Sequence, residues 1–311
     1  MRVLEMRRSV YFLAIGLLMC MNTMAQHSDP PNSAQTFIKF QDSLKNLGYQ
    51  VVNNPSEAER YNASYTMIKT LVSALKLNNS FNFGFDSLKT ISILTSPDHR
   101  FRIFSWHVLN NDGSYRYYGT IQMNNAGGKL QMFPLVDHSA EIKNPQDSTL
   151  NSSHWYGAQY YKVIPVTYNV KVPYYILLGW KGNTVKSTKK VIDILYFKDN
   201  KAWFGMPVFY GNKESVNKHR IVFEYNRQVS MMLNYIPTEG MIVFDHLVPP
   251  SPEMAGSPEL FGPDLSYDGF KIDRGRLKFV DNLELKNSPS DIDDLYNDPK
   301  KPSKEIINKL K

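Results

Sequence analysis

The stretch DGSYRYYGTIQM, residues 112–123, carries the pattern that decides the fold class. Side chains alternate between the two faces of a β-strand, so every second residue from Tyr115 to Met123 faces one side and the residues between them face the other. Asp112-Gly113 is a dipeptide typical of a tight hairpin turn. The pattern therefore predicts a strand that begins at a hairpin and buries one face.

The same period of two continues from Thr90 onwards, interrupted by Gly, Asn, Asp and Pro as in antiparallel sheets. Three further hairpins are predicted, over residues 191–208, 220–235 and 269–280, with turns at Asp199-Asn200, Asn226-Arg227 and Arg274-Gly275. The run Tyr174–Leu178 is continuously apolar, which predicts a strand buried on both faces. The strands fall into three groups, within residues 91–136, 156–208 and 219–281.

We therefore predict a mainly β protein whose residues 90–285 form an antiparallel meander, folded as a sandwich or an open barrel. Propeller-like repeated four-stranded meanders are the alternative. Three groups are too few for the usual four to eight blades, and no motif recurs at a fixed register.

Two amphipathic α-helices are predicted before the sheet. Residues 34–47 carry apolar side chains at helical spacing and are followed by Gly48, a typical helix end. Residues 55–77 start with Pro and Glu, as helices often do, and continue with a longer apolar stripe. We expect these helices in an N-terminal segment, residues 26–89, packed on the β domain, and we expect residues 286–311 to form a flexible charged tail.

The N-terminus has the three parts of a secretory signal peptide. Arg2, Arg7 and Arg8 precede an apolar run that is too short to span a bilayer, and Ala25 suits signal-peptidase cleavage. We expect residues 1–25 to be removed and the mature chain to be periplasmic or secreted. Cys20, the one cysteine, then leaves with the signal peptide, because the large residue before it does not fit a lipoprotein signal.

Composition narrows the functional classes. Removal of three Arg and one Glu with the signal peptide lowers the formal charge from +7 to +5, and the basic residues are scattered, which argues against nucleic-acid binding. No later apolar run approaches the roughly 20 residues of a transmembrane helix. A single cysteine excludes a disulfide scaffold and zinc sites built on paired cysteines.

Several strings resemble an uncharacterised family of secreted or periplasmic proteins from Bacteroidota. They are SPDHRFRIFSW (96–106), DGSYRYYGTIQ (112–122), YYILLGWKGN (174–183), IVFDHLVPP (242–250) and FGPDLSYDGFK (261–271). The resemblance spans roughly residues 36–281 and implies an envelope or secreted location. The family has no assigned activity, so the resemblance transfers no catalytic residue.

Three Asp-His neighbours could contribute to a site, at residues 98–99, 137–138 and 245–246. Adjacent residues on a strand face opposite sides, so at most one member of each pair enters a shared site. Asp245 and His246 are the preferred pair, because they end an apolar strand and precede a proline-rich loop, residues 248–267. The further binding candidates on that loop are Phe261, Asp264, Tyr267 and Asp268. In the alternative interpretation the loop covers an apolar end of the sheet, and His246 bonds to the loop backbone.

Neither a metal nor a cofactor is predicted. The sequence has no His-Glu-x-x-His, His-x-His, standard calcium loop, P-loop or Gly-x-Ser-x-Gly motif. Asp193 lies inside an apolar strand and needs a partner or a raised pKa; we favour a salt bridge or a backbone donor at the sheet edge. The 19 Tyr and four Trp could stack on sugar rings, although packing in or on the sheet is the preferred interpretation for any one of them.

These features predict an exported, non-catalytic binding or cell-envelope accessory protein. The sequence does not identify its partner; a glycan and an envelope protein are the two candidates. The alternative is a secreted hydrolase with an Asp/His-lined cleft. The sequence alone leaves open whether the protein is an enzyme.

We expect the mature protein to begin at Gln26, because the apolar run and Ala25 fit signal-peptidase cleavage. N-terminal sequencing of the protein purified from its native host measures this directly. An intact Met1 or a lipid-modified Cys20 would contradict the expected location.

Overall fold

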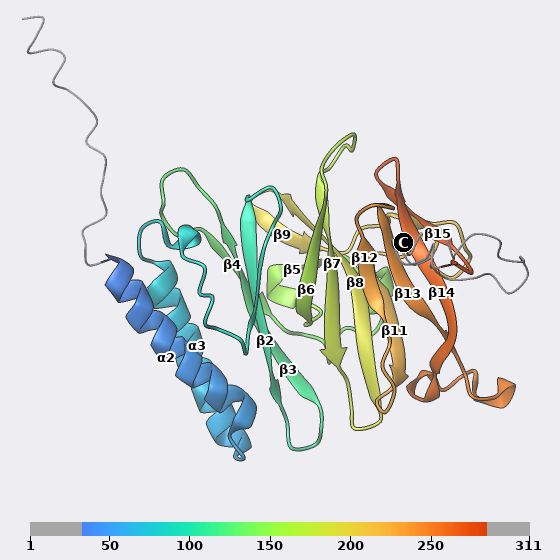
Figure 1. Cartoon of the computed structure of the whole chain (residues 1–311), viewed down its shortest axis with the longest axis horizontal. Helices are drawn as coiled ribbons and strands as arrows, with labels where there is room; N and C mark the ends of the chain where they lie inside the picture. Colours follow the sequence, from blue (N-terminus) through green and yellow to red (C-terminus); the bar gives the residue numbers. More distant parts are fainter. Residues whose placement is uncertain (1–32, 285–311) are drawn as a thin grey trace, which may run out of the picture. The chain divides into compact units, whose positions relative to one another are not determined.

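The computed structural model describes residues 33–284, which form two compact units (Figure 1). The first unit comprises residues 33–90 and the short segment Ala126–Leu130. The second comprises Ile91–Asn125 and residues 131–284. The predicted signal peptide, residues 1–25, and the predicted tail, residues 286–311, lie outside the described residues.

The first unit is helical, as the sequence predicts. It contains α2 (Ser33–Asn53), α3 (Glu57–Leu75) and the 3-10 turn η1 (Ser80–Asn82). Ser56 caps α3 by accepting a hydrogen bond from the backbone N–H of Glu59, and the acidic first turn suits the positive end of the helix dipole. Within residues 33–284, neither α-helix has both the length and the apolar character needed to cross a membrane.

The prediction that the first helix ends at Gly48 is wrong, because α2 continues to Asn53. Gly48 is buried, and a Cβ at this position would lie 2.1 Å from Thr90 Oγ1. Glycine is therefore required here because Thr90 packs closely against this position, and not because the helix ends. Val51, in the next turn of α2, is buried and extends the apolar face beyond Gly48.

The second unit contains three β-sheets. The first sheet is the meander β1 (Ser92–Thr95), β2 (Phe101–Leu109), β3 (Tyr115–Met123) and β4 (Met132–Val136). The central sheet contains β5 (Leu150–Asn151), β6 (Gln159–Val166), β7 (Tyr174–Gly182), β8 (Ser187–Lys198), β9 (Lys201–Phe204) and β11 (Ile221–Asn226). The third contains β10 (Phe209–Tyr210), β12 (Leu233–Ile236), β13 (Met241–Val248), β14 (Gly262–Asp273) and β15 (Arg276–Val280).

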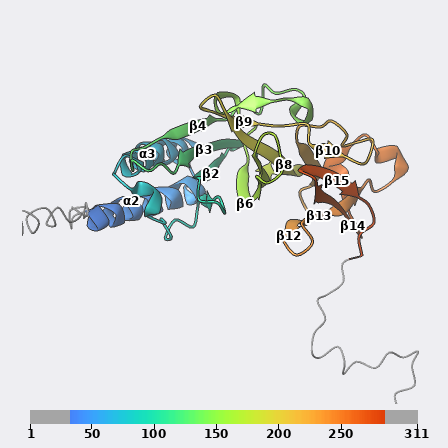
Figure 2. The same ribbon diagram turned by 90° about the horizontal axis from the view of Figure 1, so that it is seen from above.

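Every ladder between these strands is antiparallel except that of β10 with β15. Figure 2 shows β10 beside β15, at one edge of the third sheet. Short 3-10 turns interrupt the connections, at η2 (Pro145–Asp147), η3 (Ser152–His154), η4 (Pro252–Met254) and η5 (Pro258–Leu260). The predicted mainly β, antiparallel sandwich is therefore confirmed.

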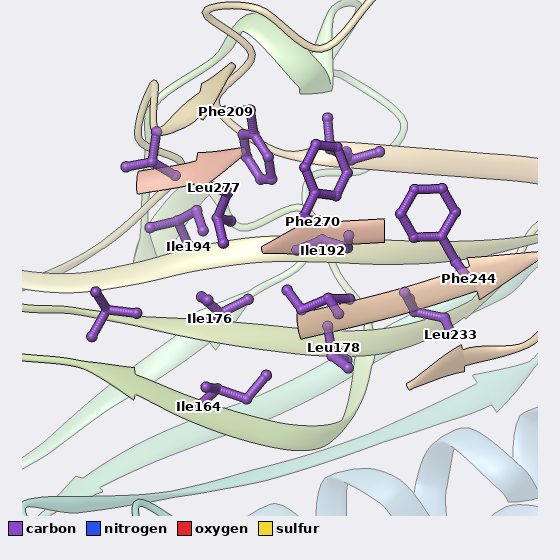
Figure 3. Packing of buried hydrophobic residues seen from close by; sticks show 14 of the residues in the cluster. Ile164, Ile176, Leu178, Ile192, Ile194, Phe209, Leu233, Phe244, Phe270 and Leu277 are labelled. Atoms are coloured by element: carbon purple, nitrogen blue, oxygen red, sulfur yellow. The ribbon is translucent and has the colours of Figure 1, made fainter. Parts of the chain in front are cut away.

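The central sheet lies between the other two and buries both of its faces (Figure 1). Ile176 and Leu178 of β7 belong to the core shared with the third sheet, where they meet Phe270 and its neighbours (Figure 3). Tyr175 and Leu177, which alternate with them, belong to the core shared with the first sheet. The continuously apolar run Tyr174–Leu178 is therefore buried on both faces, as predicted.

Three of the four predicted hairpins are present. The turns at Asp112-Gly113, Asp199-Asn200 and Arg274-Gly275 connect β2 to β3, β8 to β9 and β14 to β15. Asp199 and Asn200 have φ of 51° and 54°, and Arg274 and Gly275 have φ of 48° and 73°. Positive φ at both turn residues matches the twist of the flanking strands.

The hairpin predicted over residues 220–235 is wrong. β11 pairs with β8, and β12 pairs with β13. The reason is the unequal length of the strands: β9 pairs only with the last residues of β8, which leaves the edge of Ser187–Ile192 open for β11. Ile221 and Tyr225 of β11 then join the core between the central and third sheets.

Candidate functional site

A pocket of about 480 Å³ lies in the second unit, between the central sheet and the loops beside it. Its lining comes from the segment before and within η2, Tyr156 between η3 and β6, strands β8, β11 and β13, and η5 with the residue after it. The lining residues are Lys143, Asn144, Pro145, Gln146, Asp147, Tyr156, Lys189, Val222, Phe223, Glu224, Leu247, Pro258 and Phe261. The volume is in the range of small-molecule sites in proteins.

The carboxylates of the pocket are each paired with a cation. Glu224 Oε2 lies 3.1 Å from Lys189 Nζ, while Glu224 Oε1 accepts hydrogen bonds from Ser187 Oγ and Asn183 Nδ2, at 2.6 and 2.8 Å. Asp147 Oδ1 lies 2.7 Å from Lys218 Nζ. The pocket therefore offers polar contacts whose charges largely cancel.

Three aromatic residues supply the apolar part of the wall. Phe223 and Phe261 are half-buried. Tyr156 is 4% exposed, and burial raises its pKa, which keeps its hydroxyl neutral at physiological pH. Phe223 also packs against Phe244 of the third sheet, with ring centroids 4.7 Å apart, so its position is set by the core.

A buried ion pair holds the η2 side of the pocket. Arg220 Nε donates to Asp193 Oδ1 at 3.0 Å, and both side chains are fully buried. Arg220 Nη1 donates to the carbonyls of Pro145 and Ser148. Gln146 adds a second attachment, because its Oε1 accepts from the backbone N–H of Val222 at 3.0 Å. The pocket wall is thereby fixed to the interior of the central sheet.

The prediction that Asp193 has a partner is confirmed. Its second oxygen, Oδ2, accepts from the Tyr160 hydroxyl at 3.0 Å, and that hydroxyl accepts from Trp155 Nε1 at 2.9 Å. Asp193 lies where the partner of β8 changes from β11 to β9, which leaves room at the strand edge for the Arg220 side chain.

Lys181 lies next to the pocket wall and is 5% exposed. Its Nζ donates to Ser139 Oγ at 2.6 Å and to the Gly157 carbonyl at 2.7 Å, and lies 4.3 Å from the ring centroid of Tyr156. Burial lowers the pKa of Lys181 to about 7; the charge of Asp137 opposes the shift. Sequence reasoning missed this group, although a lysine within the apolar strand YYILLGWKG was a detectable signal.

Of the six predicted site residues, Phe261 lines the pocket, whereas the others do not. His246 and Asp268 form a separate pair, with Nδ1 and Oδ2 2.6 Å apart. Asp245 instead accepts from the backbone N–H of Met232 at 2.6 Å. Asp245 and His246 therefore have different partners, and neither lines the pocket.

The predicted loop 248–267 is shorter than expected, because β14 begins at Gly262. Asp264, Tyr267 and Asp268 therefore lie on a strand, not on a loop. The β13–β14 ladder shifts register between Asp245 and Leu247, and the resulting bulge lies opposite His246. His246 consequently faces Asp268 across the ladder instead of bonding to the loop backbone.

The remaining candidates are bound locally. Asp264 Oδ1 accepts from the hydroxyl of Ser266 at 2.7 Å and from its backbone N–H at 3.0 Å, and these bonds lower the pKa of Asp264. Tyr267 is the register partner of Asp245. In the part of the chain that the structure describes, no three His, Cys, Asp or Glu side chains are grouped so as to hold a metal ion.

The other two Asp-His neighbours also have separate surroundings. Asp98 Oδ2 accepts from the Tyr175 hydroxyl at 2.6 Å. His138 lies 3.0 Å from Glu141 and stacks on His154, with ring centroids 4.4 Å apart. These pairs therefore do not converge with His246 on one site.

Comparison with known proteins gives no match: no protein-family model, curated protein or solved structure is similar to this chain. The geometry of the pocket and its surroundings is therefore the basis for the functional inference.

We expect Arg220→Met to lower the free energy of unfolding by about 3–5 kcal/mol, because it leaves the buried Asp193 carboxylate without its cation. The double variant Asp193→Leu/Arg220→Met should lose less than the sum of its two single variants. Chemical denaturation measures all three.

Lys218→Met is the matched control, because it removes the cation of an exposed pair and should cost less than about 1 kcal/mol. An Arg220→Met variant as stable as this control would show that the buried pair does not hold the structure.

Proposed function

We propose that the protein is an exported, non-catalytic binding protein of the cell envelope, and that its pocket binds a short glycan. The observation that carries the proposal is a pocket of about 480 Å³ in which aromatic side chains lie beside polar groups, and in which both carboxylates, Asp147 and Glu224, are already paired with a lysine. The export part of the proposal is supported by the N-terminal sequence pattern and by the resemblance to secreted Bacteroidota proteins.

The chemistry of the wall favours a neutral, hydroxyl-rich ligand. Phe223 and Phe261 offer apolar surface to the C–H faces of a sugar ring. The amide of Gln146 uses its oxygen for the Val222 N–H, which leaves its NH₂ group to donate to a ligand. A strongly charged ligand would have to compete with the Lys189–Glu224 pair, whereas hydroxyl groups can bond to both partners without separating them.

The size of the pocket favours a glycan over an envelope protein as the direct ligand. A stable protein–protein contact covers about 800 Å² on each partner, whereas small-molecule sites occupy about 300–1,000 Å³. The volume of about 480 Å³ lies within the second range.

We expect a soluble tetrasaccharide to shift the backbone amide signals of Asn144, Gln146, Asp147 and residues 222–224 in a saturable way. The probes are cellotetraose, mannotetraose and chitotetraose, titrated into ¹⁵N-labelled protein and followed by NMR. Phe261→Ala and Glu224→Gln should each weaken the binding about tenfold, by removing stacking surface and a charged acceptor.

Tyr168→Ala is the matched aromatic control. Tyr168 is 91% exposed in the turn between β6 and β7 and does not line the pocket, so its loss should leave the affinity unchanged. The proposal fails if none of the three probes gives saturable shifts, or if the shifts lie away from the pocket.

A second candidate function, a secreted hydrolase, is favoured by the His246–Asp268 pair. The His246 side chain is 45% exposed, whereas that of Asp268 is 10% exposed, and their atoms lie 2.6 Å apart. A buried carboxylate that orients an accessible imidazole is the arrangement a general base requires.

If the protein is a hydrolase, His246→Gln should reduce turnover of p-nitrophenyl esters or glycosides at least about 100-fold, the usual contribution of general-base catalysis. His154→Gln is the control, because His154 stacks on His138 and is not part of the His246–Asp268 pair. Equal activity of His246→Gln and the wild-type protein would rule out this candidate.

A further inference from the structure

Lys181 makes its hydrogen bonds to uncharged groups. On β7 its Nζ donates to the Ser139 hydroxyl at 2.6 Å and to the Gly157 carbonyl at 2.7 Å. The faces of Tyr117 and Tyr156 lie 4.5 and 4.3 Å from the same nitrogen. Among the residues that the structure describes, no carboxylate pairs directly with Lys181, so hydrogen bonds and ring contacts replace the lost hydration of the buried ammonium.

Asp137, the carboxylate whose charge acts on Lys181, is bonded to the backbone. Asp137 Oδ2 accepts from the N–H of Tyr117 at 2.9 Å, and Oδ1 accepts from the N–H of Ser139 at 2.9 Å and of Gly157 at 3.3 Å. The Ser139 hydroxyl also donates to Oδ1. Asp137 is therefore connected to Lys181 through Ser139 and Gly157, and the cluster joins β3, the end of β4, the segment before β6, and β7.

Two residues connect this cluster to the pocket. Tyr156 contacts Lys181 through its ring and also lines the pocket. Lys189 is the cross-strand neighbour of Lys181 on β8, and it is the pocket cation that pairs with Glu224. Lys181 therefore lies next to two residues of the pocket wall, and a change in its charge or position occurs beside both of them.

The ionisation of Lys181 is set by all the groups that face it. Burial lowers its pKa from the usual 10.5 to about 7, the charge of Asp137 raises it, and the charge of Lys189 lowers it further. Burial raises the pKa of both Tyr117 and Tyr156, so these rings stay neutral over this range. Lys181 is thus the group of the cluster whose charge changes between neutral and mildly alkaline pH.

We propose that Lys181 is the positioning residue for the Tyr156 wall of the pocket, and that protonation of its buried amine loosens this wall. The proposal rests on the proposed function, because it assigns the regulation of the same ligand site.

The direction in which pH changes the opening of the Lys181 cluster follows from proton linkage. Opening of the cluster exposes Lys181 to water and returns its pKa toward 10.5, so the open form binds the proton more tightly than the closed form. Between about pH 7 and 10, each unit of acidification favours opening by up to about tenfold. Below about pH 7 Lys181 is protonated in both the open and the closed form, so the balance between the two forms no longer depends on pH. The pocket wall is therefore most tightly closed at mildly alkaline pH.

Amide hydrogen exchange of the full chain at pH 7, 8 and 9 tests the proposal without a ligand. The reporters are the N–H groups of Tyr117, Ser139 and Gly157, which all bond to Asp137. After correction for the intrinsic effect of pH on exchange, their protection should rise by up to about tenfold per unit in the wild-type protein. In Lys181→Met, which has no ionisable amine at this position, it should not change with pH.

The control is the double variant His138→Gln/His154→Gln. These stacked imidazoles lie beside the same segment and are ionisable side chains outside the Lys181 cluster. The control should keep the wild-type slope. A slope that disappears in the control, or that persists in Lys181→Met, would overturn the assignment to Lys181.

A direct NMR titration of the Lys181 side chain in the wild-type protein covers the case in which Lys181→Met does not fold. A midpoint near pH 7 is expected, and a midpoint near pH 10 would overturn the proposal.

Chitotetraose binding at pH 7 and 9 completes the test, with tighter binding expected at pH 9. Equal affinity at the two pH values would overturn the coupling of Lys181 to the pocket. Absence of binding by all three tetrasaccharides would instead refute the proposed function, whereas the exchange and titration results concern Lys181 alone.

Discussion

Burial of both faces of β7 and β8 is the constraint on which the second unit depends. Ile176 and Leu178 enter one core, and Tyr175 and Leu177 enter the other, so neither face of the central sheet can be left to water. Each buried aliphatic side chain contributes about 1.5–3 kcal/mol relative to exposure. The first and third sheets are the surfaces that cover these two faces, and their positions follow from this requirement.

A strand buried on both faces has no solvent for its polar groups, which explains the network around Asp193. Arg220 and Tyr160 satisfy this carboxylate inside the core, and Arg220 continues to the carbonyls that precede and follow η2. The interaction that makes a charge tolerable in the central sheet therefore also fixes one wall of the pocket. The side chains that stabilise the fold here therefore also determine the shape of the pocket.

The pocket and the Lys181 cluster differ in how charge is balanced. Lys189 and Glu224 neutralise each other where water can still reach them, so the pocket remains polar without a strong field. Lys181 is removed from water without a direct anionic partner, and burial lowers its pKa. Tyr156 separates the two environments and contacts both, which makes its position the natural point of coupling.

The sequence by itself determined the features that depend on neighbouring residues. The period of two, the apolar run Tyr174–Leu178 and the turns at Asp199-Asn200 and Arg274-Gly275 are local, because alternation and positive φ are properties of a few adjacent residues. The need of Asp193 for a partner was likewise predictable from its apolar strand.

Only the tertiary structure decided which distant segments meet. It paired β11 with β8 and kept Gly48 inside a helix, against the local turn and helix-end signals. It brought His246 and Asp268 together through the β13–β14 register, but left all predicted site residues except Phe261 outside the pocket. The pocket and the lowered pKa of Lys181 arise from segments far apart in sequence, because burial and proximity are set by packing and have no local sequence signature.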